Sequence, residues 1–82
     1  MTDEEIFDKL VEIVSESLED PTLKERVTLD TNIFTDIGMN SIAMIYIAMG
    51  IQDAFNITIN NDDVKHNLTV RDWVNYIKSR MK

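Results

Sequence analysis

Midway along the chain stands the run Ile33-Phe34-Thr35-Asp36-Ile37-Gly38-Met39-Asn40-Ser41-Ile42. Its glycine permits a tight turn, because glycine adopts backbone angles that other residues avoid. Asn40 suits the N-cap position of a helix, since its side-chain oxygen can accept a hydrogen bond from a free amide of the first turn. We therefore predict a helix from about residue 41 to residue 55, with Ser41 in its first turn.

The position of Ser41 favours one kind of chemistry. The first backbone amides of a helix have no helical partners, and they lie at the positive end of the helix dipole. A phosphate esterified to Ser41 would be stabilised there. Position alone does not establish such an ester, because a serine near a helix start is commonly only a cap or a solvent-exposed residue.

Both sides of the helix over residues 41–55 are apolar when its residues are projected at about 100° each. The expected inward side consists of Met44, Ile47, Ala48, Ile51, Ala54 and Phe55. The expected outward side carries Ile42, Ile45, Tyr46 and Met49. An apolar outward side in so small a protein indicates a surface that docks a partner. The alternative is a helix that is buried on both sides, either in a compact fold or in a homodimer.

Helical features also mark both ends of the chain. Residues 3–18 repeat apolar side chains at spacings of three and four, behind a capping-box pattern formed by Thr2 and Glu5. This helix should end by Asp20, because the proline that follows disfavours helical geometry before it. Near the other end, Thr69 can cap a last helix with apolar positions at Val70, Trp73, Val74, Ile77 and Met81. We expect Trp73 to pack in the core with its indole edge near the surface.

Two connections complete the predicted fold. Residues 20–40 lack periodicity, and we expect this long loop to be pinned to the core by Leu29, Ile33, Phe34 and Ile37. Residues 62–66 predict a short helix between the second and last long helices. The sequence thus predicts an all-α fold of four helices, three long and one short, with a long first loop. At 82 residues, we expect residues 1–82 to form a single domain.

Charge and composition narrow the function. The net charge of −7 disfavours nucleic acid and anionic membrane surfaces as partners, and no apolar run is long enough for membrane insertion. The negative charge comes from residues 1–40, which hold eleven acids and three bases. Because the first residues are acidic and no secretory signal is evident, we expect a cytoplasmic protein. We also expect a monomer.

The residues required for catalysis or metal binding are scarce. The chain has no cysteine, so a reactive thiol would have to come from a cofactor. His66 is the only histidine and has no obvious partner for a metal site, and paired acids such as Asp62 and Asp63 are commonly just solvated. No base or nucleophile elbow accompanies Ser41. We therefore predict no bound metal and no enzymatic activity.

The run 33–42 resembles the acyl carrier protein family, whose pattern there is roughly Leu-Phe-x-Asp-Leu-Gly-x-Asp-Ser-Leu. The order and lengths of the predicted helices agree with that family's bundle. The resemblance implies that Ser41 carries covalent 4′-phosphopantetheine, whose thiol holds an acyl group as a thioester. The motif residues around Ser41 are Asp36, Gly38, Met39, Asn40 and Ile42.

The resemblance also implies partners and a cargo. A phosphopantetheinyl transferase would modify Ser41, and discrete acyl-processing enzymes of fatty-acid, lipid or a related specialised pathway would use the carrier. A polyketide, aminoacyl or peptidyl carrier is an alternative of the same class. Met44, Ile47 and Ile51 are hypothesised to shelter the acyl chain. Partners would dock on Ile42, Ile45, Tyr46 and Met49, and the rival from another class is an unmodified interaction module that uses this same surface.

The second predicted helix departs from the family. Asn40 stands where the family usually has Asp, which keeps the cap but removes a charge beside the phosphate. Ala43, Tyr46 and Gln52 stand where fatty-acid carriers commonly have acids. We therefore expect docking that is more apolar and less sensitive to salt than in those carriers.

Overall fold

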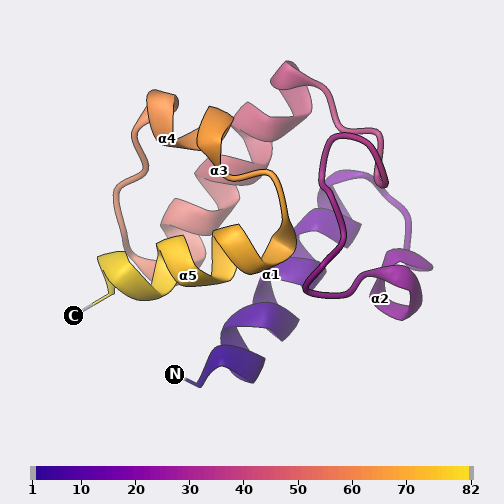
Figure 1. Cartoon of the computed structure of the whole chain (residues 1–82), viewed down its shortest axis with the longest axis horizontal. Helices are drawn as coiled ribbons and strands as arrows, with labels where there is room; N and C mark the ends of the chain where they lie inside the picture. The colour runs from indigo at the N-terminus through magenta and orange to yellow at the C-terminus, as the bar shows by residue number, and fades with distance from the viewer. Residues whose placement is uncertain (1, 82) are drawn as a thin grey trace.

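The computed structural model describes residues 2–81. Over this range the chain folds into five helices and no strand (Figure 1). They are α1 (Asp3–Ser17), α2 (Leu23–Arg26), α3 (Ser41–Phe55), α4 (Asn61–His66) and α5 (Val70–Arg80). The predicted all-α bundle with three long helices and a long first loop is confirmed, and α2 is an additional turn within that loop. None of these helices is long and apolar enough to cross a membrane.

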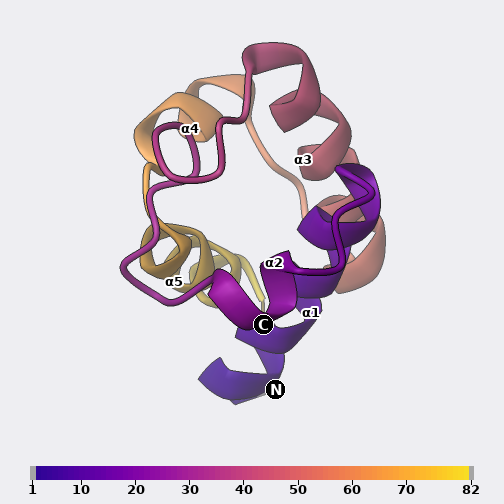
Figure 2. The same cartoon turned by 90° about the vertical axis from the view of Figure 1, so that its right-hand side faces the viewer.

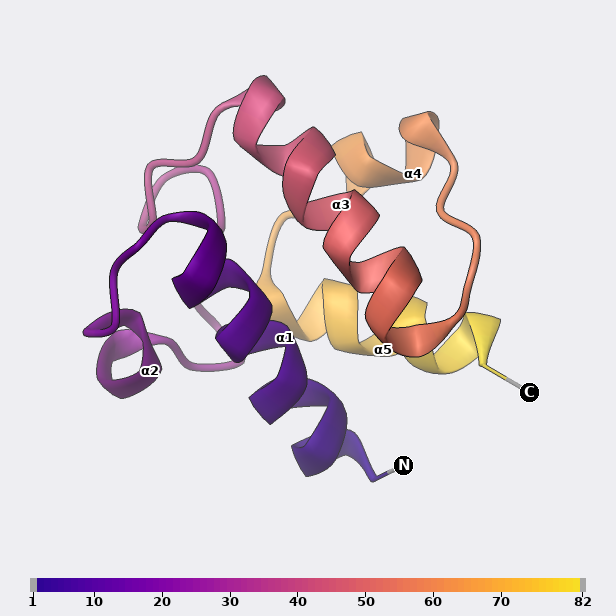
Figure 3. The same ribbon diagram turned by 180° about the vertical axis from the view of Figure 1, so that it is seen from behind.

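Helices α1 and α3 lie side by side and run in opposite directions (Figure 3). Their close approach explains Gly50, which lies inside α3. A Cβ atom at Gly50 would stand 3.1 Å from Cγ2 of Ile13, tighter than ordinary van der Waals contact. Glycine lowers helix stability by about 1 kcal/mol relative to alanine. At position 50 its lack of a side chain lets α3 pack closely against α1.

The helices enclose one apolar core, with α1 and α3 on one side of it and α4 and α5 on the other (Figure 2). The largest fully buried side chains are Trp73, Ile6, Leu10, Met44, Ile47, Ile51 and Ile77. Trp73 packs in the core as predicted, but its indole edge does not reach the surface, because its exposed fraction is 0%. The ring stands on the core face of α5, where complete burial of the largest side chain removes the most apolar area from water.

The predicted helix signals account for the observed ends of α1 and α5. Capping boxes form between Thr2 and Glu5 before α1 and between Thr69 and Asp72 before α5, as the sequence indicates. Helix α1 ends at Ser17, ahead of Asp20. These local hydrogen bonds satisfy amides that a helix cannot satisfy by itself.

The long loop and one position of α3 differ from expectation. The side chain of Leu29 is 39% exposed and does not pin the loop to the core, contrary to expectation. The loop is tied to α5 here by the Leu29 backbone oxygen, which accepts a hydrogen bond from the Arg71 amide at 2.9 Å. Ile33 is buried, and Phe34 and Ile37 are partly buried against the core, as predicted. Ala54 is exposed rather than inward-facing, since it lies at the margin of the buried side of α3, one residue before the helix ends.

Candidate functional site

Ser41 is exposed at the first position of α3. Gly38 makes the preceding turn with a φ of +79°, which a glycine adopts without strain. Asn40 is the N-cap, and its Oδ1 accepts a hydrogen bond of 2.8 Å from the Ala43 amide. The Met44 amide donates to the Asn40 carbonyl at 3.0 Å and so begins the helical ladder. The predicted cap and turn are confirmed.

Two amides beside the Ser41 hydroxyl remain available. Within residues 2–81, the backbone N–H groups of Ser41 and Ile42 have no hydrogen-bond acceptor, because the cap oxygen is used by Ala43. Helix α3 has fifteen residues, so these donors lie at the positive end of a full-length helix dipole. An exposed hydroxyl next to two free donors suits a phosphate ester bonded to that hydroxyl.

Polar side chains shape the loop that delivers Ser41. Asn32 Oδ1 accepts hydrogen bonds from the amides of Phe34 at 2.9 Å and Thr35 at 3.0 Å. Asp36 Oδ2 in turn accepts from the Asn32 amide at 2.8 Å. The aspartate of the motif therefore has a structural role, which it shares with Asn32. Sequence reasoning missed Asn32, although an asparagine two residues before a turn is a recognisable signal.

The same loop is tied to the start of α5. The Ile33 amide donates to the Leu68 carbonyl at 2.8 Å, and the Val70 amide donates to the Thr31 carbonyl at 3.0 Å. Met39, the motif residue just before the cap, is buried in the core. Backbone pairing at one end and a buried side chain at the other thus fix the approach to Ser41.

A cavity of about 500 Å³ lies beside Ser41, between α3 and α4. Its lining is mostly apolar and consists of Phe34, Ser41, Met44, Ile45, Ala48, Met49, Gln52, Ile59, Asn61, Val64 and Lys65. Of the three residues hypothesised to shelter an acyl chain, Met44 lines this cavity. Ile47 and Ile51 are fully buried in the core and are not part of its wall. Sequence reasoning missed the contribution of α4, which no periodic pattern in α3 could reveal.

The outward side of α3 forms an exposed apolar surface. Its members and their exposed fractions are Ile42 at 68%, Ile45 at 56%, Tyr46 at 66% and Met49 at 54%. Ile45 and Met49 also border the cavity next to α4. Ile42 and Tyr46 border a second hollow of about 490 Å³, which Ser17 at the end of α1 helps to line. The surface that the sequence predicted is therefore contiguous with Ser41 and with both hollows.

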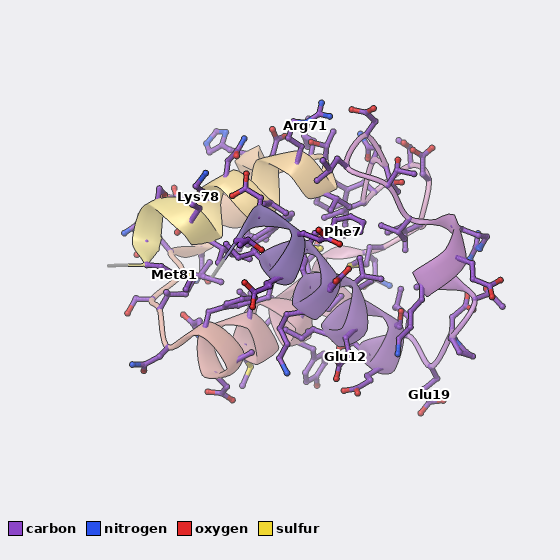
Figure 4. The ribbon with its side chains drawn as sticks, turned by 90° about the horizontal axis from the view of Figure 1, so that it is seen from below. Phe7, Glu12, Glu19, Arg71, Lys78 and Met81 are labelled. Atoms are coloured by element: carbon purple, nitrogen blue, oxygen red, sulfur yellow. The ribbon has the colours of Figure 1, made fainter. Side chains whose placement is uncertain are left out.

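Charges lie mainly away from this surface. Glu12 stands on α1 and Glu19 lies just beyond the carboxyl end of that helix, while Arg71 and Lys78 stand along α5 (Figure 4). On α3 itself Asp53 is the one ionisable carboxylate. Within residues 2–81, no group of three or more histidines, cysteines or acids is placed to hold a metal ion.

The environment of Tyr76 on α5 perturbs its phenol. Burial, together with a hydrogen bond to Asp63, raises the pKa of Tyr76 above its ordinary value. Two carboxyls at the surface have lowered pKa values: that of Glu5 because the Thr2 backbone amide donates to it, and that of Asp20 because the Thr22 hydroxyl and amide donate to it. None of these three groups lines the cavity beside Ser41.

Comparison with known proteins identifies the family. A family profile described as "Phosphopantetheine attachment site" matches residues 8–77. An acyl carrier protein from Lactobacillus johnsonii is 35% identical over 79 residues, which cover 96% of each chain. One from Beutenbergia cavernae is 38% identical over 93% of this chain and 90% of its own. One from Guillardia theta is 33% identical over 99% of this chain and 98% of its own. The chain belongs to the acyl carrier protein family, whose members are carriers with a phosphopantetheine attachment site rather than catalysts.

Proposed function

We propose that the Ser41 hydroxyl is the attachment point of 4′-phosphopantetheine and that residues 1–82 act as a single carrier domain. The observation that carries this proposal is the exposed Ser41 hydroxyl beside two unpaired amides at the start of α3. When attached, the arm supplies the thiol that this cysteine-free chain lacks, and an acyl group can be held on it as a thioester.

The chain's own residues position the attachment point. Asn40 fixes the first turn of α3 through its bond to Ala43, and Gly38 turns the loop so that Ser41 faces solvent. The free amides of Ser41 and Ile42 would hold the phosphate oxygens. In this proposal, the phosphopantetheinyl transferase supplies the base that removes the hydroxyl proton during attachment.

The cavity between α3 and α4 supports an alkyl cargo. Its wall is mostly apolar and includes Ser41 at one edge, so a chain that begins at the arm's thiol can fold back into it. We assign the carrier to fatty-acid or lipid synthesis on this ground. An aminoacyl or peptidyl cargo is more polar and would gain less from burial against this apolar wall, and a polyketide is the other alternative cargo of the same class.

The exposed apolar surface of Ile42, Ile45, Tyr46 and Met49 is the proposed docking surface for acyl-processing enzymes and for the transferase. Its continuity with the attachment point supports this role, because an enzyme seated there also reaches the arm. An unmodified interaction module would use the same surface without needing Ser41.

We expect the carrier to work in the cytoplasm as a monomer.

Intact-mass measurement after coexpression with a broad-specificity phosphopantetheinyl transferase tests the proposal. The wild-type chain should gain the mass of one arm, and Ser41→Ala should gain none. Ser17→Ala is the matched control, since Ser17 is also exposed at a helix end but at the carboxyl end of α1, where no free amides point outward. A wild-type chain that stays unmodified, or a loaded Ser41→Ala chain, would refute the assignment.

A further inference from the structure

Helix α4 has two faces with different environments. Asn61, Val64 and Lys65 lie on the face that walls the cavity beside Ser41. The spacing of these residues, three and four apart, places them on one side of a helix. Asp63 projects from the opposite side, toward α5. The contacts that Asp63 makes therefore attach α4, which forms the cavity wall, to α5 on the side away from the cavity.

Apolar packing alone holds α4 weakly. None of its six residues is buried, and Val64 is only partly buried against the core. Asn60, its N-cap residue, makes no side-chain capping bond. A helix with so little buried apolar surface opens more readily than the rest of a domain.

The connections on either side of α4 are fixed by hydrogen bonds. Before it, the Ile59 amide donates to Oε1 of Gln52 on α3 at 2.8 Å. After it, the Leu68 carbonyl accepts from the Ile33 amide at 2.8 Å. The chain entering and leaving α4 is thus anchored, whereas the helix between these two anchors depends on other contacts.

Asp63 supplies those contacts. Its Oδ2 accepts a hydrogen bond of 2.7 Å from the Tyr76 hydroxyl and another of 3.0 Å from Nη2 of Arg80. The Arg80 guanidinium also lies 5.1 Å from the centre of the Tyr76 ring, within the range of a cation–π contact. The three residues, which we call the Asp63 clasp, join the middle of α4 to the last two turns of α5.

We infer that the Asp63 clasp (Asp63, Tyr76 and Arg80) positions α4 as the adjustable wall of the cavity and so sets which acyl chains the carrier shelters. The inference rests on the proposed function, because it takes the cavity to be the acyl site. With the clasp closed, α4 stays against the cavity and shields the bound chain. With the clasp broken, α4 moves away more often, and the cargo is exposed to solvent.

The first test uses the unmodified chain and needs no cargo. Amide hydrogen exchange at residues 64–66 should become about three- to tenfold faster in Tyr76→Phe and in Asp63→Asn, the effect of losing a charge-assisted hydrogen bond that is partly exposed. The matched control is Asp30→Asn, which breaks the 2.7 Å ion pair of Asp30 with Arg71 at the other end of α5. It should change exchange at residues 64–66 by less than about twofold. Equal exchange in all four proteins would overturn the inference.

The second test uses the loaded carrier. The wild type and the three variants are charged with short or medium-length straight-chain acyl groups, and hydroxylamine cleavage of the thioester is timed. The wild type should protect the medium chain more than the short one. The ratio of the two thioester half-lives, medium chain over short chain, measures this protection. In Tyr76→Phe and Asp63→Asn the ratio should fall by about threefold or more, while Asp30→Asn keeps it.

The outcomes separate this inference from the proposed function. If the wild type is not loaded at Ser41, the proposed function fails. If loading is normal but the ratio of protection is the same in Tyr76→Phe and Asp63→Asn as in the wild type, the clasp does not control the cavity and the inference is overturned. Thermal unfolding of each variant checks that it is folded, and Phe at position 76 keeps the aromatic ring in place.

Discussion

The two helices that bound the cavity, α3 and α4, are held in the molecule by different forces. Helix α3 buries five residues in the core and has a bonded N-cap, whereas α4 buries none and has no side-chain cap bond. Polar contacts, above all those of Asp63, take the place of burial in α4. A fixed helix thus carries the attachment point and the docking surface, and a loosely packed helix faces it across the space proposed for the cargo.

The largest expected difference between the two helices is in core packing. Ile51→Ala on α3 should lower the free energy of unfolding by about 2–5 kcal/mol, because it leaves a cavity in a fully buried site. Val64→Ala on α4 should cost about 1 kcal/mol or less, because its side chain is already partly in water. Urea unfolding with linear extrapolation measures both. Equal losses would mean that α4 is as firmly packed as α3.

The N-caps provide a second, smaller difference. Asn40→Ala should lower the free energy of unfolding by about 1 kcal/mol, because the Ala43 amide loses its acceptor. Asn60→Ala should change it by only a few tenths of a kcal/mol, since Asn60 makes no such bond. Thermal and urea unfolding of the pair check this. A larger loss at Asn60 than at Asn40 would contradict the comparison.

Alkaline pH should lower the free energy of unfolding through the ionisation of Tyr76. The folded protein raises the pKa of Tyr76, so its protonated form is favoured by folding. This contribution to stability is fully present below the phenol's unfolded pKa of about 10 and is lost as pH rises through the higher folded value. Stability profiles from neutral to alkaline pH should therefore fall more steeply for the wild type than for Tyr76→Phe. Parallel profiles would show that Tyr76 is not the group responsible.

The smallest effect is expected from salt. The exposed side of α3 is apolar except for Asp53, so affinity for an acyl-processing enzyme should change by less than about threefold between roughly 50 and 500 mM salt. Titration calorimetry across a salt series measures this, with Ile45→Ala as a variant that should weaken binding at every salt concentration. A steep loss of affinity with salt would place the recognition elsewhere, for example on the acidic side of α1.

Local signals in the sequence predicted much of the site. Asn40 and Gly38 act through their own backbone neighbours, so their roles follow from residue type and spacing. Periodicity likewise identified α1, α3 and α5. Helix α2 was missed because four residues make a single turn, which is too short to show a period.

Contacts between segments that are distant in the sequence could not be predicted from it. Leu29 holds the loop through its backbone, which pairs with Arg71 forty-two positions further on, and not through its exposed side chain. The cavity wall on α4 and the clasp between Asp63 and Tyr76 depend on how α4 lies relative to α3 and α5. Helical projection of α3 placed Met44, Ile47 and Ile51 on one face, yet only the neighbouring helix determines which of them borders open space.

Because Trp73 is buried, it can serve as an intrinsic fluorescent probe of the packing around it. It is the sole tryptophan, and its ring meets that of Tyr76 edge to face with centroids 5.8 Å apart. Within residues 2–81 its indole nitrogen has no hydrogen-bond partner. Its fluorescence should therefore be emitted at short wavelength, and the spectrum should shift when the packing around Tyr76 changes. Motion of the cargo-facing wall could then be followed in real time without an added label.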